Sequence, residues 1–333
     1  MRPVLPVPAA KTDAALFAAV ELWARARHRR YVRWLRKREQ PPGRRFSLAL
    51  PKCTNDKFLW RKVFDRDPLF TRLCDKLEAK RIVQTRAPEV AIPEVLWVGE
   101  DARAIPAELF RADALVKTNH GAGTNILLRD TALSPGEIAA RINRHLRKPY
   151  GRSTGQWGYR NIPRRVFVER RIDAPGLVEL KVYIAGGHVP RVLHIVDRFG
   201  RPHGDVWKDD GSGLTLSEEP YLTAEDAPCL PLPASTGAAI DAARQIAGEI
   251  DYIRVDFMTD GTRLWFGEVT VYPLGGLLAH GGADPENAHN RYWDLRRSWF
   301  MQTPQRGWRE AYRRALIRSF KVARSGPVVW GRG

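Results

Sequence analysis

Two carboxylates between residues 252 and 273 have the spacing of a metal site on a β-hairpin. Arg254 and Asp256 alternate with apolar residues, and so do Glu268 and Thr270 on the returning segment. Because side chains alternate between the two faces of a strand, each of these polar pairs lies on one face. Carboxylate oxygens are ligands that Mg²⁺ prefers. The pattern therefore indicates a Mg²⁺ site, although solvated strand charges would alternate in the same way.

The turn of this hairpin decides whether Asp256 and Glu268 share a face. A two-residue turn at Asp260-Gly261 would place them on opposite faces, because a shift of one residue reverses every side chain. A three-residue turn over Thr259–Gly261, with Gly261 in the left-handed conformation, would place them on the same face. We predict the three-residue turn.

A glycine-rich loop and two further strand-like segments add charged residues of the same kind. Lys117 precedes the loop in "LVKTNHGAGTNILLRD" (residues 115–130), where small residues let backbone N–H groups approach a phosphate. Glu179 and Lys181 share a face in "LVELKVYI", and Glu169 ends the apolar run "VFVE". Taken singly, the loop is explained as a hairpin and each charge as half of a surface ion pair. As a set with the metal hairpin, they indicate a nucleotide site.

The periodicity of the central chain predicts a mixture of strands and helices. β-Branched residues between glycine-rich bends predict strands within residues 91–99, 111–129, 165–172, 176–187, 189–197 and 252–273. Helical spacing predicts helices within residues 56–85, 134–148 and 234–250. This order favours an α+β fold over a doubly wound parallel sheet. Residues 197–213 and 274–282 are expected to be loops near the site, the second lining an acceptor pocket, or else plain connections.

The net charge of +18 is confined to the two ends of the sequence. Residues 1–50 carry 12 Lys and Arg against 3 Asp and Glu, and residues 291–333 carry 11 against 2. A nucleic-acid-binding enzyme would more often spread its basic residues over the working cleft, so no nucleic acid is expected as a partner. Basic ends on a neutral body favour an anionic membrane surface or an acidic polymer.

Both basic ends are predicted to be amphipathic helices. The N-terminal apolar face comprises Leu16, Val20, Trp23, Ala24, Tyr31, Trp34 and Leu35. The C-terminal one comprises Trp308, Ala311, Tyr312, Ala315, Leu316, Ser319 and Phe320. Such faces more often pack on the body of a protein than lie on a membrane, and basic outer faces could still meet lipid headgroups.

Composition excludes several other classes of protein. No apolar run approaches the roughly 20 residues of a membrane-spanning helix, and the first residues lack the apolar core of a signal peptide. Cys53, Cys74 and Cys229 form no CxxC pair, which favours a reduced, cytoplasmic chain without a disulfide framework or zinc knuckle. Without a GxSxG motif or a Cys–His pair, no covalent enzyme intermediate is expected.

Four motifs occur in an order that a known family shares. They are "NDKFLWRKVFDRDPLFTRLCDK" (residues 55–76), "LVKTNHGAG" (115–123), "VELKVYIAGG" (178–187) and "IRVDFMTDGTRLWFGEVTVYPLGG" (253–276). The chain thereby resembles the ATP-grasp enzymes over roughly residues 45–280. More narrowly, it is similar to their TupA-like branch, which is linked to teichuronopeptide and other surface-polysaccharide biosynthesis. The resemblance implies an α+β ATP-grasp fold with two antiparallel-sheet lobes clasping ATP.

Four segments follow if the resemblance holds. They are a basic amphipathic N-terminal helix (1–45), an N-terminal linker subdomain (46–110), the ATP-grasp catalytic lobes (111–290) and a basic C-terminal helical arm (291–333).

The resemblance also implies a role for each candidate residue. Contacts with ATP are implied for Lys76, Lys117, His120, Gly121, Ala122, Gly123, Thr124, Glu169, Glu179 and Lys181. His120 could equally stabilise the loop. Mg²⁺ ligands are implied to be Asp256, Glu268 and Thr270, the last standing where many ATP-grasp enzymes have asparagine. Arg254 and Lys181 are the implied catalytic cations, placed to stabilise charge on the transferred phosphoryl group.

The implied reaction joins a carboxylate to an amine through an acyl phosphate, with ATP and Mg²⁺. For the TupA-like branch, the implied carboxylate is a uronic acid or another acidic group of a cell-surface polysaccharide. Two alternatives stay open: a kinase that phosphorylates a hydroxyl on the same fold, and a non-catalytic polysaccharide-assembly protein. The expected location is cytoplasmic, with peripheral association at the inner face of the membrane through the basic arms as an option.

Overall fold

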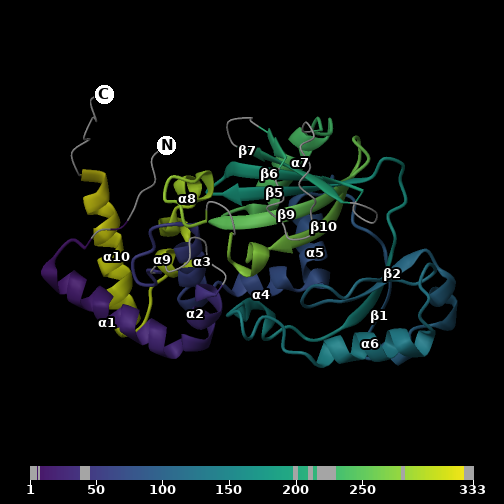
Figure 1. The fold of residues 1–333 in the computed structure, drawn as a ribbon, viewed down its shortest axis with the longest axis horizontal. Helices are drawn as coiled ribbons and strands as arrows, with labels where there is room; N and C mark the ends of the chain where they lie inside the picture. Colours follow the sequence, from purple (N-terminus) through teal and green to yellow (C-terminus); the bar gives the residue numbers. More distant parts are fainter. Residues whose placement is uncertain are drawn as a thin grey trace.

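The computed structural model describes residues 6, 8–37, 46–197, 202–208, 213–215, 230–278 and 282–325. It contains two antiparallel sheets and a group of helices beside them (Figure 1). The predicted α+β class is therefore confirmed. Among the described helices, none is both long enough and apolar enough to cross a membrane.

The larger sheet has six strands in the order β10-β9-β5-β6-β7-β8. They are β5 (Val178–Ala185), β6 (His188–Val196), β7 (His203–Lys208), β8 (Gly213–Thr215), β9 (Tyr252–Thr259) and β10 (Leu264–Thr270). One face is apolar and packs on helices α4 (Pro68–Cys74), α5 (Lys76–Arg86) and α7 (Thr236–Ala247). The loop expected over residues 197–213 is wrong in part, because β7 lies there. Pairing with β6 imposes a strand on a polar, glycine-rich segment.

The smaller sheet has the order β1-β4-β2-β3. Its strands are β1 (Val95–Gly99), β2 (Ala114–Thr118), β3 (Ile126–Leu127) and β4 (Val166–Arg170). Helix α6 (Pro135–Arg147) packs against its apolar face and begins with a capping box between Ser134 and Glu137. The short helices η1 (Ala102–Ala104) and η2 (Ala107–Arg111) connect β1 to β2, and η3 (Trp157–Tyr159) precedes β4.

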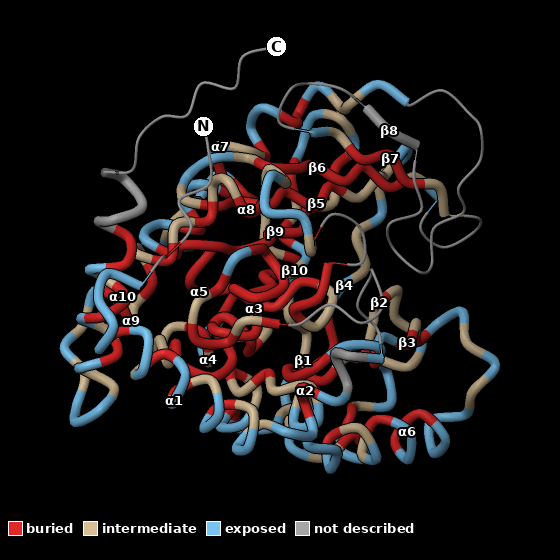
Figure 2. The backbone as a smooth tube through the Cα atoms, turned by 60° about the vertical axis from the view of Figure 1, so that its left-hand side comes forward, coloured by how far each residue is buried: buried red, intermediate tan, exposed pale blue. Residues whose placement is uncertain are grey.

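The remaining helices pack together into what we call the helical body (Figure 1). Its members are α1 (Lys11–Arg27), α2 (Arg29–Arg36), α3 (Thr54–Val63), η4 (Pro273–Gly275), α8 (Ala288–Tyr292), η5 (Leu295–Arg297), α9 (Trp299–Gln302) and α10 (Trp308–Ser325). Figure 2 shows that α3, at its centre, is buried. The described parts of the two basic ends therefore belong to one structural unit.

The apolar faces of both basic ends pack on this body rather than facing outward. Phe17 of α1 contacts the ring of Tyr312 of α10, with ring centroids 6.0 Å apart, and Val20, Ala24 and Leu316 are buried beside them. The prediction of two amphipathic helices is confirmed, except that α1 and α2 are separate helices. The side chains at positions 34 and 35 lie outside the described part. Packing, not lipid, accounts for these faces.

A buried ion pair at the centre of the helical body gives the first testable prediction. Arg61 is fully buried, pairs with Asp251, and donates to the carbonyls of Tyr252 (2.8 Å) and Val271 (2.9 Å). Arg61→Met removes the cation and leaves a buried carboxylate, so we expect unfolding in urea to require about 3–5 kcal/mol less. Arg111→Met, at an exposed position, should change stability by less than about 0.5 kcal/mol. Equal effects would contradict this account.

Candidate functional site

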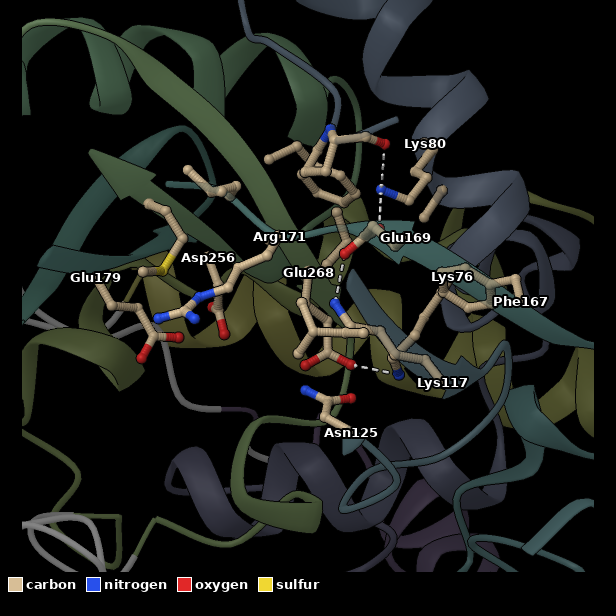
Figure 3. Close-up of a pocket in the computed structure, with 18 of the residues that line it drawn as sticks. Lys76, Lys80, Lys117, Asn125, Phe167, Glu169, Arg171, Glu179, Asp256 and Glu268 are labelled. Atoms are coloured by element: carbon tan, nitrogen blue, oxygen red, sulfur yellow. Dashed lines mark hydrogen bonds and ion pairs between the residues drawn. The ribbon is translucent and has the colours of Figure 1, made fainter. Parts of the chain in front are cut away.

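A cavity of about 450 Å³ lies between the polar faces of the two sheets (Figure 3). Helix α5 adds residues at one side. The cavity exists because the strands alternate: Leu115 and Lys117 of β2 face it, while Val116 packs in the core behind. Its charged and amide side chains are Lys76, Lys80, Lys117, Asn125, Glu169, Arg170, Arg171, Glu179, Lys181, Asp256 and Glu268.

Three charged residues stand in one row across the larger sheet. Asp256 of β9 is the register partner of Lys181 on β5 and of Glu268 on β10. Both oxygens of the Asp256 carboxylate accept from Arg254, at 2.7 Å each, and Oδ2 also accepts from Lys181 at 3.1 Å. Burial alone would raise the pKa of Asp256, but Arg254 and Lys181 hold it below its ordinary value. Asp256 is therefore a buried anion clamped by two cations.

The shared face of Asp256 and Glu268 is confirmed, but the three-residue turn is wrong. Thr259 pairs with Leu264, so four residues connect the strands, and Gly261 has the expected positive φ of 95°. The register then shifts between positions 266 and 268, where Gly267 forms a bulge. This extra residue brings Glu268 opposite Asp256.

The donor atoms on this face fit a magnesium ion. Mg²⁺ is commonly held by one or two carboxylates together with substrate phosphates and water. Asp256 and Glu268 supply two carboxylates, and Glu268 accepts from Lys76 at 3.0 Å. Within the described residues, no group of three or more His, Cys, Asp and Glu could hold a metal. Thr270 shares this face, and its buried hydroxyl has no hydrogen-bond partner in the described structure.

Glu169 joins two lysines at the other wall of the cavity. Its carboxylate lies 2.5 Å from the Nζ atom of Lys117 and 2.5 Å from that of Lys80. Burial opposes ionisation, but the two lysines hold the pKa of Glu169 below its ordinary value. At the far end, Glu179 accepts from Lys181 at 2.8 Å. Glu169 and Glu179, for which contacts with ATP are implied, thus both line the cavity and both contact lysines.

The glycine-rich loop is held by hydrogen bonds at its base. The amide of Lys76 donates to the carbonyl of Asn119 at 2.8 Å, and Lys76 Nζ donates to the carbonyl of Gly121 at 2.5 Å. The hydroxyls of Thr118 and Thr124 lie 3.2 Å apart, which closes the loop. Lys76 therefore ties the loop to Glu268 on the larger sheet.

The loop itself lies beside the cavity. The cavity lining includes Asn125, immediately after the loop, but none of residues 120–124. His120 is buried, and burial lowers its pKa, while Ala122 and Gly123 are exposed. A role for these loop residues in binding phosphate stays a prediction.

Two glycines in the loop form a matched pair for mutation. Gly121 (φ 78°) and Gly123 (φ 74°) both adopt left-handed conformations that disfavour a side chain. A Cβ at Gly121 would also lie 2.8 Å from the ring of Tyr150, whereas none of the surrounding atoms lies within 4 Å of one at Gly123. We expect Gly121→Ala to raise the KM for ATP several-fold more than Gly123→Ala, as measured by steady-state kinetics. Equal values would place the loop away from the nucleotide.

Seven of the predicted site residues line the cavity together: Lys76, Lys117, Glu169, Glu179, Lys181, Asp256 and Glu268. Arg254 and Thr270 stand beside this set on the same sheet face. Sequence reasoning missed Lys80, Asn125 and Arg171, which Figure 3 shows around the same space. Lys80 follows Lys76 by one helical turn on α5, and that spacing could have identified it.

Two antiparallel sheets that enclose a cavity lined by lysines and carboxylates are the arrangement that the resemblance to ATP-grasp enzymes implies. A model of the TupA-like ATP-grasp family matches residues 56–282. The chain belongs to this family.

Solved structures of ATP-grasp proteins are also similar to this chain. D-alanine–D-alanine ligase from Bacillus anthracis is 16% identical, with 76% of this chain and 68% of that chain covered and a TM-score of 0.35. A RimK domain ATP-grasp protein from Sphaerobacter thermophilus is 14% identical, with 72% and 78% covered and a TM-score of 0.39. The ATP-grasp ligase PsnB, in complex with a minimal precursor, is 14% identical, with 76% of this chain and 62% of that chain covered and a TM-score of 0.35. A comparison with curated proteins found no match.

Proposed function

We propose that this protein is an ATP- and Mg²⁺-dependent carboxylate–amine ligase. Its carboxylate substrate would be a uronic acid or another acidic group of a cell-surface polysaccharide. The observation that carries the proposal is the row of Lys181, Asp256 and Glu268, which faces Lys117 across the cavity between the sheets. Membership of the ATP-grasp family supports the use of ATP.

The charges of the cavity suit transfer of a phosphoryl group. An oxygen of the substrate carboxylate attacks the γ-phosphorus of ATP, and the bond to the departing ADP breaks. The amine nitrogen then attacks the acyl carbon, phosphate leaves, and the nitrogen loses a proton to give the amide. Lys117, Lys76 and Lys181 would bind the phosphates and stabilise the charge that develops. Asp256 and Glu268 would hold Mg²⁺, which when bound neutralises phosphate charge.

Two observations support an acidic saccharide as the substrate. The excess positive charge of the chain lies at its ends, outside the matched residues 56–282, where it could attract a polyanion without disturbing the nucleotide site. The resemblance to the TupA-like branch implies the same chemistry. The basic arms thus serve substrate attraction in this proposal.

The decisive experiment supplies Mg²⁺-ATP, a panel of uronic acids and oligouronates, and a panel of amines. Release of ADP and phosphate together with a new amide, followed by mass spectrometry, is the expected result. Hydroxylamine in place of the amine should trap the acyl phosphate as a hydroxamate. A phosphorylated hydroxyl without an amide would instead establish a kinase. No nucleotide turnover with any pair, although ATP binds, would reject the ligase.

A further inference from the structure

A second cleft lies outside the ATP cavity, where the N-terminal helices meet the segment that precedes β4. It has a volume of about 1000 Å³ and adjoins a smaller hollow of about 330 Å³. The two spaces share Arg27, Pro149, Arg152 and Arg160 in their walls, so they form one groove. We call this groove the arginine cleft.

Arginines from four separate parts of the chain line the larger space: Arg27, Arg29, Arg30, Arg66, Arg152, Arg160 and Arg309. None of the described residues that line either space is Asp or Glu. Several arginines elsewhere are paired, as Arg61 is with Asp251 and Arg254 with Asp256. Among the described residues, none of the seven cleft arginines forms an ion pair. Within the described part of the chain, this concentration of unneutralised charge favours binding of an anion.

The charges of several cleft arginines act on one histidine within the cleft. His28 lies at the junction of α1 and α2 and lines the larger space. Burial and the nearby charges of four cleft arginines, Arg66, Arg27, Arg160 and Arg309, together lower its pKa to about 4, with burial as the largest cause. Guanidinium groups from α1, the segment after α3, the segment before β4 and α10 therefore converge around one histidine.

Two exposed tryptophans stand at the edge of the cleft. Trp23 lines it and is 37% exposed, and Trp308 is 42% exposed. Their ring centroids are 4.7 Å apart. The negative face of an aromatic ring attracts the slightly positive C–H groups on the face of a pyranose sugar, whereas guanidinium groups bind carboxylates in a bidentate manner. Together, the two residue types match a sugar chain that carries carboxylates.

The cleft approaches the ATP cavity through two tyrosines. Tyr150 and Tyr159 line the smaller space, and their ring centroids lie 4.9 Å apart. Tyr150 packs against Gly121 of the glycine-rich loop. The hydroxyl of Tyr159 is hydrogen-bonded to Cys74, which lines the cavity. These two tyrosines therefore link the wall of the arginine cleft to the glycine-rich loop and to the wall of the ATP cavity.

We propose that the arginine cleft binds an acidic oligosaccharide, with its carboxylates on the arginines and a sugar ring on Trp23. The chain so bound would direct one carboxylate toward the ATP cavity past Tyr150. The path to the cavity rests on the proposed ligase function, whereas binding in the cleft does not. Residues 23, 27–31 and 309, which complete the cleft, lie outside the residues matched by the family model.

Binding is tested on the full chain without ATP, using hexagalacturonate as the probe and isothermal titration calorimetry as the measurement. We expect Arg152→Glu/Arg160→Glu to weaken binding about tenfold or more, because both side chains are exposed in the cleft. Arg111→Glu/Arg141→Glu makes the same charge change at exposed positions outside the cleft and should leave affinity within about twofold. Neutral maltohexaose should not bind.

Two further measurements complete the test. The first uses the unmodified protein, so a folding defect of a variant cannot affect it, and the second tests the role of the aromatic ring. Saturating hexagalacturonate should raise the pKa of His28, followed by NMR on the unmodified protein, because bound carboxylates offset the arginine charges. Trp23→Leu, which keeps every charge, should weaken hexagalacturonate several-fold. An unchanged pKa of His28, or equal affinity in the two double variants, overturns the proposal.

The remaining outcomes identify other ligands or separate the cleft proposal from the ligase proposal. Vesicles of anionic phosphatidylglycerol, or a single-stranded DNA hexamer, that bind more tightly than hexagalacturonate and depend on Arg152 and Arg160 would also overturn it. Hexagalacturonate that binds in the cleft without any turnover of ATP would support the cleft and reject the ligase. Turnover of ATP with a uronate that is unaffected by Arg152→Glu/Arg160→Glu would support the ligase and reject the cleft as its substrate site.

Discussion

Replacing Asp256 with asparagine is expected to lower kcat/KM by at least about 100-fold. The charge of Asp256 offsets both Arg254 and Lys181, and its oxygens face the space where Mg²⁺ and the phosphates would lie. Without that charge, the two cations would repel each other, and a bound Mg²⁺ would lose a charged ligand. The rate should be measured from ADP release at saturating Mg²⁺.

Asp260→Asn is the control for this prediction. Asp260 lies in the turn of the same hairpin, exposed, where it accepts from the amides of Thr262 (2.9 Å) and Arg263 (2.8 Å). The same chemical change there should leave kcat/KM within about twofold, because surface substitutions have small effects. Circular dichroism and thermal unfolding should show that both variants fold. Activity near wild type in folded Asp256→Asn protein would remove Asp256 from the site.

Lys117→Met is expected to weaken binding of ATP by about 10- to 100-fold, the cost of a lost charge-assisted hydrogen bond. Lys117 is the more exposed of the two lysines on Glu169, with 16% of its side chain accessible against 9% for Lys80. A phosphate can therefore compete for it. Glu169 keeps Lys80 as a partner in this variant, so the fold should persist.

Lys80→Met separates a structural role from a binding role. Lys80 lies deeper, and burial lowers its pKa although Glu169 opposes that shift. We expect its replacement to reduce the unfolding temperature more than Lys117→Met does, and the affinity for ATP less. Both values can be obtained from thermal unfolding with and without ATP. If Lys117→Met had the larger effect on the unfolding temperature and Lys80→Met the larger effect on ATP affinity, Lys80 would be the lysine that binds ATP and Lys117 the structural one.

Strand alternation was sufficient to predict the polar face of the larger sheet. Arg254, Asp256, Glu268 and Thr270 share one face because apolar residues at the intervening positions are buried in the core. The connection between β9 and β10 was harder to predict. A four-residue connection with a bulge at Gly267 places Asp256 and Glu268 on the same face, as a three-residue turn would. The local sequence pattern cannot distinguish these two arrangements.

Features built from distant residues were beyond prediction. Amphipathic spacing revealed the helices at both ends, but not that α1 and α10 would cover each other, since one apolar stripe does not specify its partner. The arginine cleft is a similar case. Arg27, Arg66 and Arg160 occur in segments without a common motif, and only the fold brings them together.

The packing of α1 on α10 has a consequence for synthesis of the protein. The two helices are joined by an ion pair between Asp13 and Arg318, residues that are 305 positions apart in the sequence. A ribosome must therefore synthesise the residues of both sheets before α10 emerges and can cover Phe17 and Val20 of α1. Until then, the nascent chain carries an uncovered apolar helix, which invites aggregation or a chaperone. The arginine cleft, which takes residues from α1, α2 and α10, can form only when translation is nearly over.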